Sequence, residues 1–288
     1  MTDQPMNDGG LVAHGIDTAR PSVARVYDYA LGGKDNYESD RELYRQIMKI
    51  APETPVWARA NRRWLSTVIT WLVEEAGVRR FIDAGSGLPT VENTHQIAQK
   101  VHADASVIYI DNDPSVVAHG RALLLDNEWT QFTAADLAKP EEVLADPAVA
   151  ELLAAGEPVA LVMALMLHHI ADYEQTREIA GKYVDALPPG SYLAITHACN
   201  PGDGGPVDVL VTELVEKVKD AFPTLAFRSV EQISSLFGEL EILEPGVVPL
   251  GEWHVPGGRV EEHAPAGIRD AIYGGVARKA SSQPEVGG

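Results

Sequence analysis

Acidic residues and glycines follow three short apolar segments of this chain. Asp83 precedes the turn Gly85-Ser86-Gly87, Asp111-Asn112 ends the segment that starts at Ser106, and Asp136-Leu137 follows a third segment. In open α/β sheets, ligands bind beyond the carboxyl ends of the strands. Glycines have no side chain and let a ligand approach the backbone. We therefore expect one site for a nucleotide-like ligand where these three strand ends meet.

Two ligand classes fit the first turn. A dinucleotide fingerprint has a third glycine where this chain has Thr90, and Pro89 lacks an N–H group that a pyrophosphate needs. The pattern Asp-x-Gly-x-Gly is instead typical of methyltransferases, whose S-adenosylmethionine carries no phosphate. A nicotinamide-dependent oxidoreductase is the less favoured alternative, and an ordinary strand-to-helix turn stays open. Thr90 is expected to cap a helix that runs to Val101.

The second and third strand ends suggest how such a cofactor is held. The Asp111 carboxylate can accept hydrogen bonds from both ribose hydroxyls. Asp136 can accept from the exocyclic amine of adenine, and Leu137 can lie against the ring. A solvated turn is the alternative for Asp111, and a loop carboxylate is the alternative for Asp136.

A fourth apolar segment begins at Met163, which we expect to contribute to the cofactor site, and ends in His168-His169. His168 is a candidate general base or hydrogen-bond donor to the methyl acceptor, although a structural histidine is also compatible with the pattern. Adjacent side chains on an extended segment point to opposite faces, so we expect no metal site here.

The N-terminal region is rich in tyrosine and turn residues. Helical spacing over residues 23–30 is followed by a Gly-Gly-Lys-Asp-Asn loop. We expect a lid that completes the cofactor pocket, and Tyr27 or Tyr29 is an alternative general base. A helical pair that only packs on the sheet stays open. The expected lid residues are Tyr27, Tyr29, Gly33, Lys34 and Tyr37.

Composition limits the partners. A net charge of −19 over 288 residues disfavours nucleic acid. The basic cluster from Arg59 to Arg63 fits a solvated or a carboxylate-binding helix face. One cysteine, Cys199, excludes a disulfide framework, and no apolar segment is long enough to span a membrane. We expect a cytoplasmic protein with a small-molecule acceptor and no membrane partner.

Strands and helices alternate from residue 79 onward, which is typical of a mostly parallel sheet covered on both faces. The expected strands are 79–83, 106–110, 131–134, 158–164, 191–196, 241–243 and 272–277. The expected organisation is a flexible tail (1–20), a helical extension or lid (21–78), a cofactor-binding domain (79–279) and a second flexible tail (280–288).

Five segments together resemble the actinobacterial S-adenosylmethionine methyltransferase family formerly catalogued as a domain of unknown function. They are RVYDYALGGKDNY (25–37), ANR (60–62), FIDAGSGLPT (81–90), VIYIDNDP (107–114) and YGGVARK (273–279). The resemblance implies a class I methyltransferase fold, which is Rossmann-like, with a seven-stranded, mostly parallel sheet, an antiparallel last strand and added N-terminal helices.

The resemblance also implies site roles. Asp83, Gly85 and Gly87 would line the methionine part of the cofactor, Asp111 and Asn112 the ribose and the adenine edge, and Asp136 and Leu137 the adenine. It assigns no acceptor, for which we expect a small molecule such as a secondary metabolite. A non-catalytic regulator that binds S-adenosylmethionine or S-adenosylhomocysteine is the alternative function.

Overall fold

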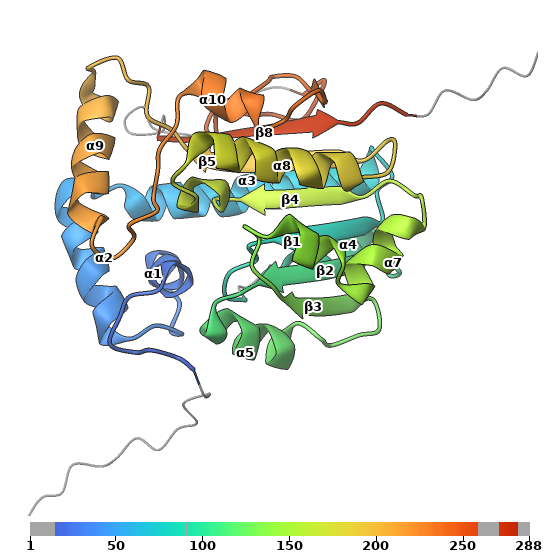
Figure 1. Cartoon of the computed structure of the whole chain (residues 1–288), viewed down its shortest axis with the longest axis horizontal. Coiled ribbons are helices and arrows are strands. Elements are labelled where there is room, and N and C mark those ends of the chain that lie inside the picture. Colours follow the sequence, from blue (N-terminus) through green and yellow to red (C-terminus); the bar gives the residue numbers. More distant parts are fainter. Residues whose placement is uncertain (1–14, 90–91, 259–270, 282–288) are drawn as a thin grey trace, which may run out of the picture.

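The computed structural model describes residues 15–89, 92–258 and 271–281. Its central sheet has the strand order β3-β2-β1-β4-β5-β8-β6, and β7 also pairs with β8 (Figure 1). The first five strands of the chain run parallel, and β8 is antiparallel to β5. The strands are β1 (Arg80–Ala84), β2 (Ser106–Asp111), β3 (Thr130–Ala134), β4 (Ala160–Ala164), β5 (Tyr192–Ala198), β6 (Glu241–Ile242), β7 (Val248–Pro249) and β8 (Ile272–Arg278).

The edge beside β8 differs from the expected seven strands. β6 pairs with Ala277 and Arg278, and β7 pairs with Tyr273 and Gly274, so both lie along one edge of β8. Between them Pro245 has no N–H group to donate to a neighbouring strand. The sixth position of the sheet is therefore one strand broken in two. The mostly parallel sheet with an antiparallel last strand is confirmed.

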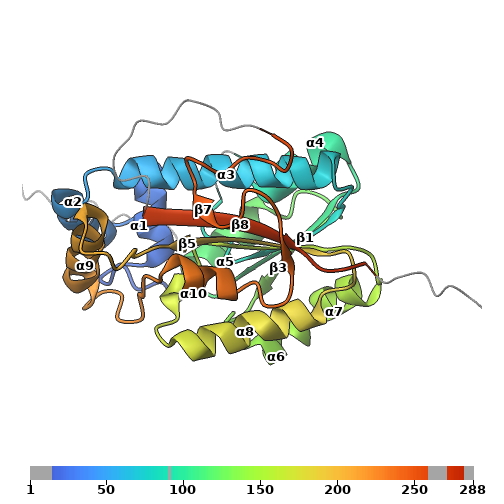
Figure 2. The same ribbon diagram turned by 90° about the horizontal axis from the view of Figure 1, so that it is seen from above.

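Helices cover both faces of the sheet and the carboxyl ends of its parallel strands. Figures 1 and 2 show α3 and α4 on one face, α6, α7, α8 and α10 on the other, and α1, α2 and α9 beyond the strand ends. The helices are α1 (Val23–Ala30), α2 (Glu38–Ile50), α3 (Thr54–Glu74), α4 (Thr94–Val101), α5 (Pro114–Leu123), α6 (Pro140–Leu144), α7 (Pro147–Ala154), α8 (Tyr173–Ala186), α9 (Pro206–Val218) and α10 (Val230–Ser235), with a 3-10 turn at Leu167–His169.

Helix α4 begins later than expected. Its first residue is Thr94, and the Gln96 side chain accepts a hydrogen bond from the Asn93 N–H group, 2.9 Å away. The expected start at Thr90 was therefore wrong, because the capping interactions lie three residues further along. Thr90 itself and Val91 lie outside the described residues.

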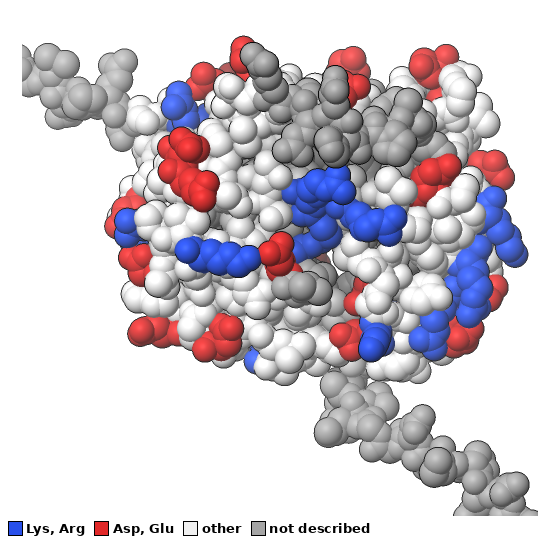
Figure 3. All heavy atoms as spheres, turned by 180° about the vertical axis from the view of Figure 1, so that it is seen from behind, with Lys and Arg blue, Asp and Glu red and all other residues white. Residues whose placement is uncertain are grey.

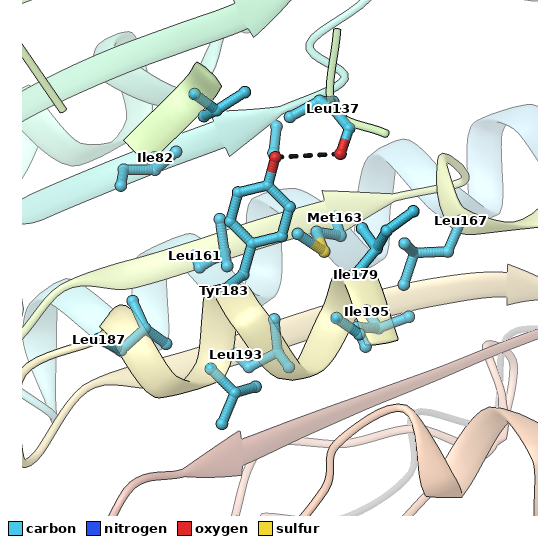
Figure 4. Packing of buried hydrophobic residues seen from close by; sticks show 14 of the residues in the cluster. Ile82, Leu137, Leu161, Met163, Leu167, Ile179, Tyr183, Leu187, Leu193 and Ile195 are labelled. Atoms are coloured by element: carbon cyan, nitrogen blue, oxygen red, sulfur yellow. Dashed lines mark hydrogen bonds between the residues drawn. The ribbon is translucent and has the colours of Figure 1, made fainter. Parts of the chain in front are cut away.

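Strand alternation explains the two cores that sandwich the sheet. Phe81 and Tyr109 point toward the face under α3, whereas Ile82 and Ile110 point toward the face under α8. Figure 4 shows the second core, where the Tyr183 hydroxyl donates to the Leu137 carbonyl oxygen, 3.0 Å away. A third cluster joins α1, α2 and α9 to the start of α3 and of β8. This third cluster places the N-terminal helices over the strand ends.

None of the helices within the described residues combines the length and the apolar character that a membrane crossing requires.

The contact of α5 with β3 gives a matched pair of glycine variants. A Cβ on Gly120 would lie 2.3 Å from the Phe132 ring, whereas a Cβ on Gly181 in α8 has no neighbour within 4 Å. We expect Gly120→Ala to lower the free energy of unfolding by roughly 1 to 3 kcal/mol through overpacking. Gly181→Ala should raise it by about 0.5 to 1 kcal/mol because alanine favours helix. Urea unfolding measures both, and a stabilised Gly120→Ala variant would contradict the close packing of α5.

Candidate cofactor site

The turn after β1 is tied directly to β2. The N–H groups of Gly85 and Ser86 donate to the Ile110 carbonyl oxygen at 2.8 and 3.2 Å. Gly85 and Gly87 have φ of +80° and +65°, which favour glycine. A Cβ on Gly85 would lie 2.8 Å from Cγ of Met166, whereas a Cβ on Gly87 would meet no atom of the described residues within 4 Å. The space beside Gly85 is thus taken by Met166, and the open approach lies at Gly87.

Asp111 joins the ends of β1 and β2. One carboxylate oxygen accepts from the Gly87 N–H group, 3.0 Å away, and the other accepts from the Asp113 N–H group, 2.9 Å away. Burial raises the pKa of this carboxyl, and the two backbone hydrogen bonds oppose that shift. Each oxygen keeps further acceptor capacity. The half-buried Asp111 can therefore accept two hydroxyl groups of a ligand while it holds both turns.

Asp83 lies in the same layer but is more deeply buried, with 6% of its surface exposed. Its carboxylate accepts from the Thr94 hydroxyl, 2.6 Å away, which fixes α4 against β1. Burial raises the pKa of Asp83, while the Thr94 hydrogen bond and the positive charge of Arg62 act in the opposite direction. Asp83 therefore positions the first turn as well as contributing a carboxylate to it.

The end of β3 reaches the same turn. Leu137 is buried, and its Cδ1 would lie 3.6 Å from a Cβ on Gly85. Asp136 accepts from the Ala138 N–H group, 3.0 Å away, and stays half-buried. Ser86 Oγ is buried and has no hydrogen-bond partner among the described residues. An adenosyl cofactor fits this donor and acceptor set, because Asp111 offers acceptors to a ribose and Leu137 an apolar contact to a base.

The end of β4 contributes two residues that the sequence pattern did not mark. Met166 packs beside Gly85, and Leu165 has the positive φ of 52°, which is uncommon for a residue other than glycine. The Leu165 N–H group lies 3.0 Å from both the carbonyl and hydroxyl oxygens of Thr196. Met163, an expected site residue, is fully buried in the core under α8 (Figure 4) and is not brought to the turn.

A chain of hydrogen bonds links α1 to the ends of β4 and β5. The Asn61 side-chain amide donates to the Tyr27 hydroxyl oxygen, 2.9 Å away, and accepts from the Thr196 hydroxyl, 2.7 Å away. The Tyr27 hydroxyl donates to the Ala58 carbonyl oxygen. Burial raises the pKa of Tyr27. The Tyr29 ring instead packs edge-on against Tyr44, with centroids 5.2 Å apart.

Helix α1 is also fastened to the start of α5. Arg25 and Asp40 form a buried ion pair of 2.9 Å, and Arg25 donates to the Ser115 hydroxyl, 3.3 Å away. The Ser22 hydroxyl donates to the Asp113 carboxylate. Because Asp113 also donates its N–H to Asp111, the N-terminal helices touch the turn that carries Asp111. No periodic pattern of residues indicates this long-range pairing.

The expected lid residues lie on the loop between α1 and α2. Gly33 packs tightly on Asp28, where a Cβ would lie 1.9 Å from a carboxylate oxygen. Lys34 is exposed, and Tyr37 is 36% exposed, with its ring 5.2 Å from the Arg25 guanidinium. Asn112 is exposed at the start of α5. Gly33 therefore shapes the loop, while Lys34 and Tyr37 have accessible side chains.

His168 belongs to a buried histidine cluster. The segment is a 3-10 turn and not extended, so the expectation that its two rings face apart was wrong: their centroids lie 4.3 Å from each other. His197 lies 5.5 Å from His168 and its Nε2 contacts Arg228. Burial and the neighbouring charges hold the pKa of His168 well below its usual value, and its Nδ1 has no partner among the described residues. Within the described ranges, no three potential ligands are grouped to hold a metal ion.

These neutral histidines make stability depend on pH. Burial lowers the pKa of His169 to about 4 and that of His197 to about 3. Between pH 6.5 and 4 the unfolded chain binds protons that the folded chain excludes, so the free energy of unfolding should fall as pH falls, by up to roughly 1.4 kcal/mol per pH unit for each histidine. His169→Phe should reduce that slope. Urea unfolding at pH 7 and pH 5 tests this, and an unchanged slope in His169→Phe would contradict a buried neutral His169.

Comparisons with known proteins identify the family of this chain. A family model described as S-adenosyl methyltransferase matches residues 11–280. A crystal structure of a putative methyltransferase from Thermobifida fusca YX is 38% identical, with 92% of this chain and 97% of that chain covered and a TM-score of 0.84. A DUF574 family protein from Streptomyces avermitilis MA-4680 is 33% identical, with 91% and 99% covered and a TM-score of 0.83.

A more distant structure agrees in fold alone. An O-methyltransferase family protein from Burkholderia thailandensis is 12% identical and has a TM-score of 0.51, with 89% of this chain and 64% of that chain covered. A search of curated proteins found no significant match. The family model covers nearly the whole chain and the two bacterial structures cover more than nine-tenths of it, so the chain belongs to the S-adenosyl methyltransferase family.

Proposed function

We propose that the protein transfers a methyl group from S-adenosylmethionine to a small-molecule acceptor, with the cofactor held across the ends of β1, β2 and β3. The observation that carries the proposal is the Asp111 carboxylate, which is fixed by the Gly87 and Asp113 N–H groups and still has acceptor capacity. Asp111 and Asn112 would hold the ribose and the adenine edge. Asp136 and Leu137 would hold the adenine.

The methionine end of the cofactor would lie at the first turn. Asp83, Gly85, Ser86 and Gly87 would line it, since the turn offers the open approach at Gly87 and a Ser86 hydroxyl that has no hydrogen-bond partner among the described residues. When bound, S-adenosylmethionine supplies the electrophilic methyl carbon. The chain's own part is to align the acceptor and to exclude water, which the lid residues Gly33, Lys34 and Tyr37 would do from the loop above.

A general base is needed only where the acceptor carries a proton. His168 is one candidate, because its imidazole is neutral and its Nδ1 has no partner in the described part of the chain, but its lowered pKa makes it a weak base. Tyr27 is a second candidate, whose hydroxyl already donates to Ala58 and whose pKa is raised by burial. Tyr29 packs on Tyr44 and stays a third candidate.

Charge and local structure favour a small acceptor and an adenosyl cofactor. The net charge of −19 disfavours a polyanionic acceptor, so a small secondary metabolite is the more compatible acceptor.

The start of α4 bears on the nicotinamide alternative. A pyrophosphate needs free N–H groups where a helix starts. In α4 the His95 N–H group donates instead to the Tyr109 hydroxyl, 2.9 Å away, which weakens the nicotinamide alternative.

Turnover separates an enzyme from a regulator that only binds the cofactor. The purified protein would be incubated with methyl-labelled S-adenosylmethionine and small-molecule extracts of its host. We expect label in a small molecule and stoichiometric S-adenosylhomocysteine. Tight cofactor binding without any labelled product across the extracts would favour the regulator.

Loss of the Asp111 carboxylate should weaken cofactor binding. We expect Asp111→Ala to reduce the affinity for S-adenosylhomocysteine by roughly 1 to 3 kcal/mol, because charge-assisted hydrogen bonds to the ribose are lost. Asp104→Ala is the matched control, since Asp104 pairs with Arg79 in an exposed position. Calorimetric titration measures both variants. An unchanged affinity in Asp111→Ala would remove Asp111 from the site.

If the loop between α1 and α2 is a lid, ligand binding should protect it from proteolysis. Lys34 is exposed, so trypsin should cleave after it in the free protein. S-adenosylhomocysteine should slow that cleavage because the loop closes on the ligand. Cleavage after Lys219, at the far end of α9, should not change. Mass spectrometry of timed digests follows both sites, and equal cleavage after Lys34 with and without ligand would rule out the lid.

A further inference from the structure

Helix α3 carries a basic cluster that the proposed function has not used. Arg59, Arg62 and Arg63 stand three and four residues apart, so they share one side of the helix. On a chain with net charge −19, none of the three forms an ion pair with a carboxylate among the described residues. Figure 3 shows the face that α3 covers, with basic side chains gathered near its centre.

Arg62 is the member of this cluster that contacts the loop between β1 and α4. It is half-buried, and its guanidinium donates to the Glu92 carbonyl oxygen in the loop before α4. Its neighbour Asn61 donates to the Tyr27 hydroxyl oxygen. The charge of Arg62 lowers the pKa of both Asp83 and Tyr27, against the larger effect of their burial. Arg62 therefore contacts the loop that joins the first turn to α4, one residue along α3 from the contact with α1.

Within the described residues, the Arg62 guanidinium donates one hydrogen bond, to the Glu92 carbonyl oxygen. A guanidinium has five N–H donors, so most of them remain for solvent or a ligand. Partial burial of a cation without an anion is unfavourable, and a planar guanidinium matches a carboxylate through two parallel hydrogen bonds. An anionic ligand group at this point would pair with a guanidinium that has no ion pair among the described residues.

We propose that Arg62 binds the α-carboxylate of the amino-acid end of S-adenosylmethionine, opposite an Asp83 carboxylate that faces the α-ammonium group. The cofactor ends in a zwitterion, and the two side chains carry opposite charges and contact the same short stretch of chain, Arg62 at Glu92 and Asp83 at Thr94. This inference rests on the proposed function. Of the two interpretations of the basic cluster, a solvated helix face and a carboxylate-binding helix face, the proposal assigns carboxylate binding to Arg62 only.

Two ligands separate this role from a structural one. S-adenosylhomocysteine has the amino-acid end, and 5′-deoxy-5′-methylthioadenosine has the same adenosine and sulfur without it. We expect Arg62→Met to weaken S-adenosylhomocysteine binding by about tenfold or more, with methylthioadenosine binding changed by less than about twofold. Arg62→Gln should show the same selective loss of S-adenosylhomocysteine binding, because glutamine keeps a donor for the Glu92 carbonyl oxygen but carries no charge. Arg63→Met, one residue away and exposed, is the control.

The outcomes are distinct. Equal losses for both ligands in Arg62→Gln would show that Arg62 only supports the loop, and no loss for either ligand would show that it touches no cofactor; both overturn the inference. A wild-type protein that binds neither ligand would instead contradict the proposed function. Calorimetric titration gives all the affinities, and thermal unfolding of each variant verifies that it is folded.

Discussion

The structure depends on one carboxylate at the carboxyl edge of the sheet. Asp111 accepts hydrogen bonds from the turn after β1 and from the residue that starts α5, so one side chain sets the spacing of two strand ends. Parallel strands bring their carboxyl ends to one edge, and this edge is where side chains from separate segments can meet a ligand. The ligand-binding role that we propose for Asp111 therefore uses the same carboxylate that holds the two turns.

Buried polar contacts also fix the N-terminal helices relative to the strand ends. The buried ion pair of Arg25 with Asp40 and the Ser22 contact with Asp113 fasten α1 to α5, while Asn61 connects Tyr27 to Thr196. Such buried polar contacts add little net stability, because desolvation offsets much of the attraction. Their geometric requirements are strict, however, and they fix one position of α1 over the strand ends. The loop that follows α1 is thereby placed above the site.

Much of the sheet could be predicted because its signals are local. Apolar runs and the turns after them fixed the positions of the parallel strands, and the acidic residue after β2 is where the sequence placed it. The broken edge strand was harder, since β6 and β7 have two residues each and pair only through β8. The start of α4 was missed because threonine, like asparagine, is a favoured N-cap residue, and residue type alone did not decide between Thr90 and Asn93.

The site was predictable in its backbone and less so in its side chains. Gly85 was expected to leave room for ligand, but Met166 from the end of β4 fills that space. Met163 was placed at the site by sequence proximity, although strand alternation turns it into the core. A tight turn after β4 gives Leu165 its positive φ and brings the two adjacent histidine rings together. No periodic pattern in the sequence predicts that turn. Long-range contacts of this kind require the folded chain.

A crystal structure of the protein with S-adenosylhomocysteine is the most direct measurement. We expect the ribose hydroxyls within hydrogen-bond distance of both Asp111 oxygens, with the Gly87 and Asp113 N–H groups still bound to them. A ligand bound elsewhere, or an Asp111 carboxylate that meets no ligand atom, would contradict the central claim.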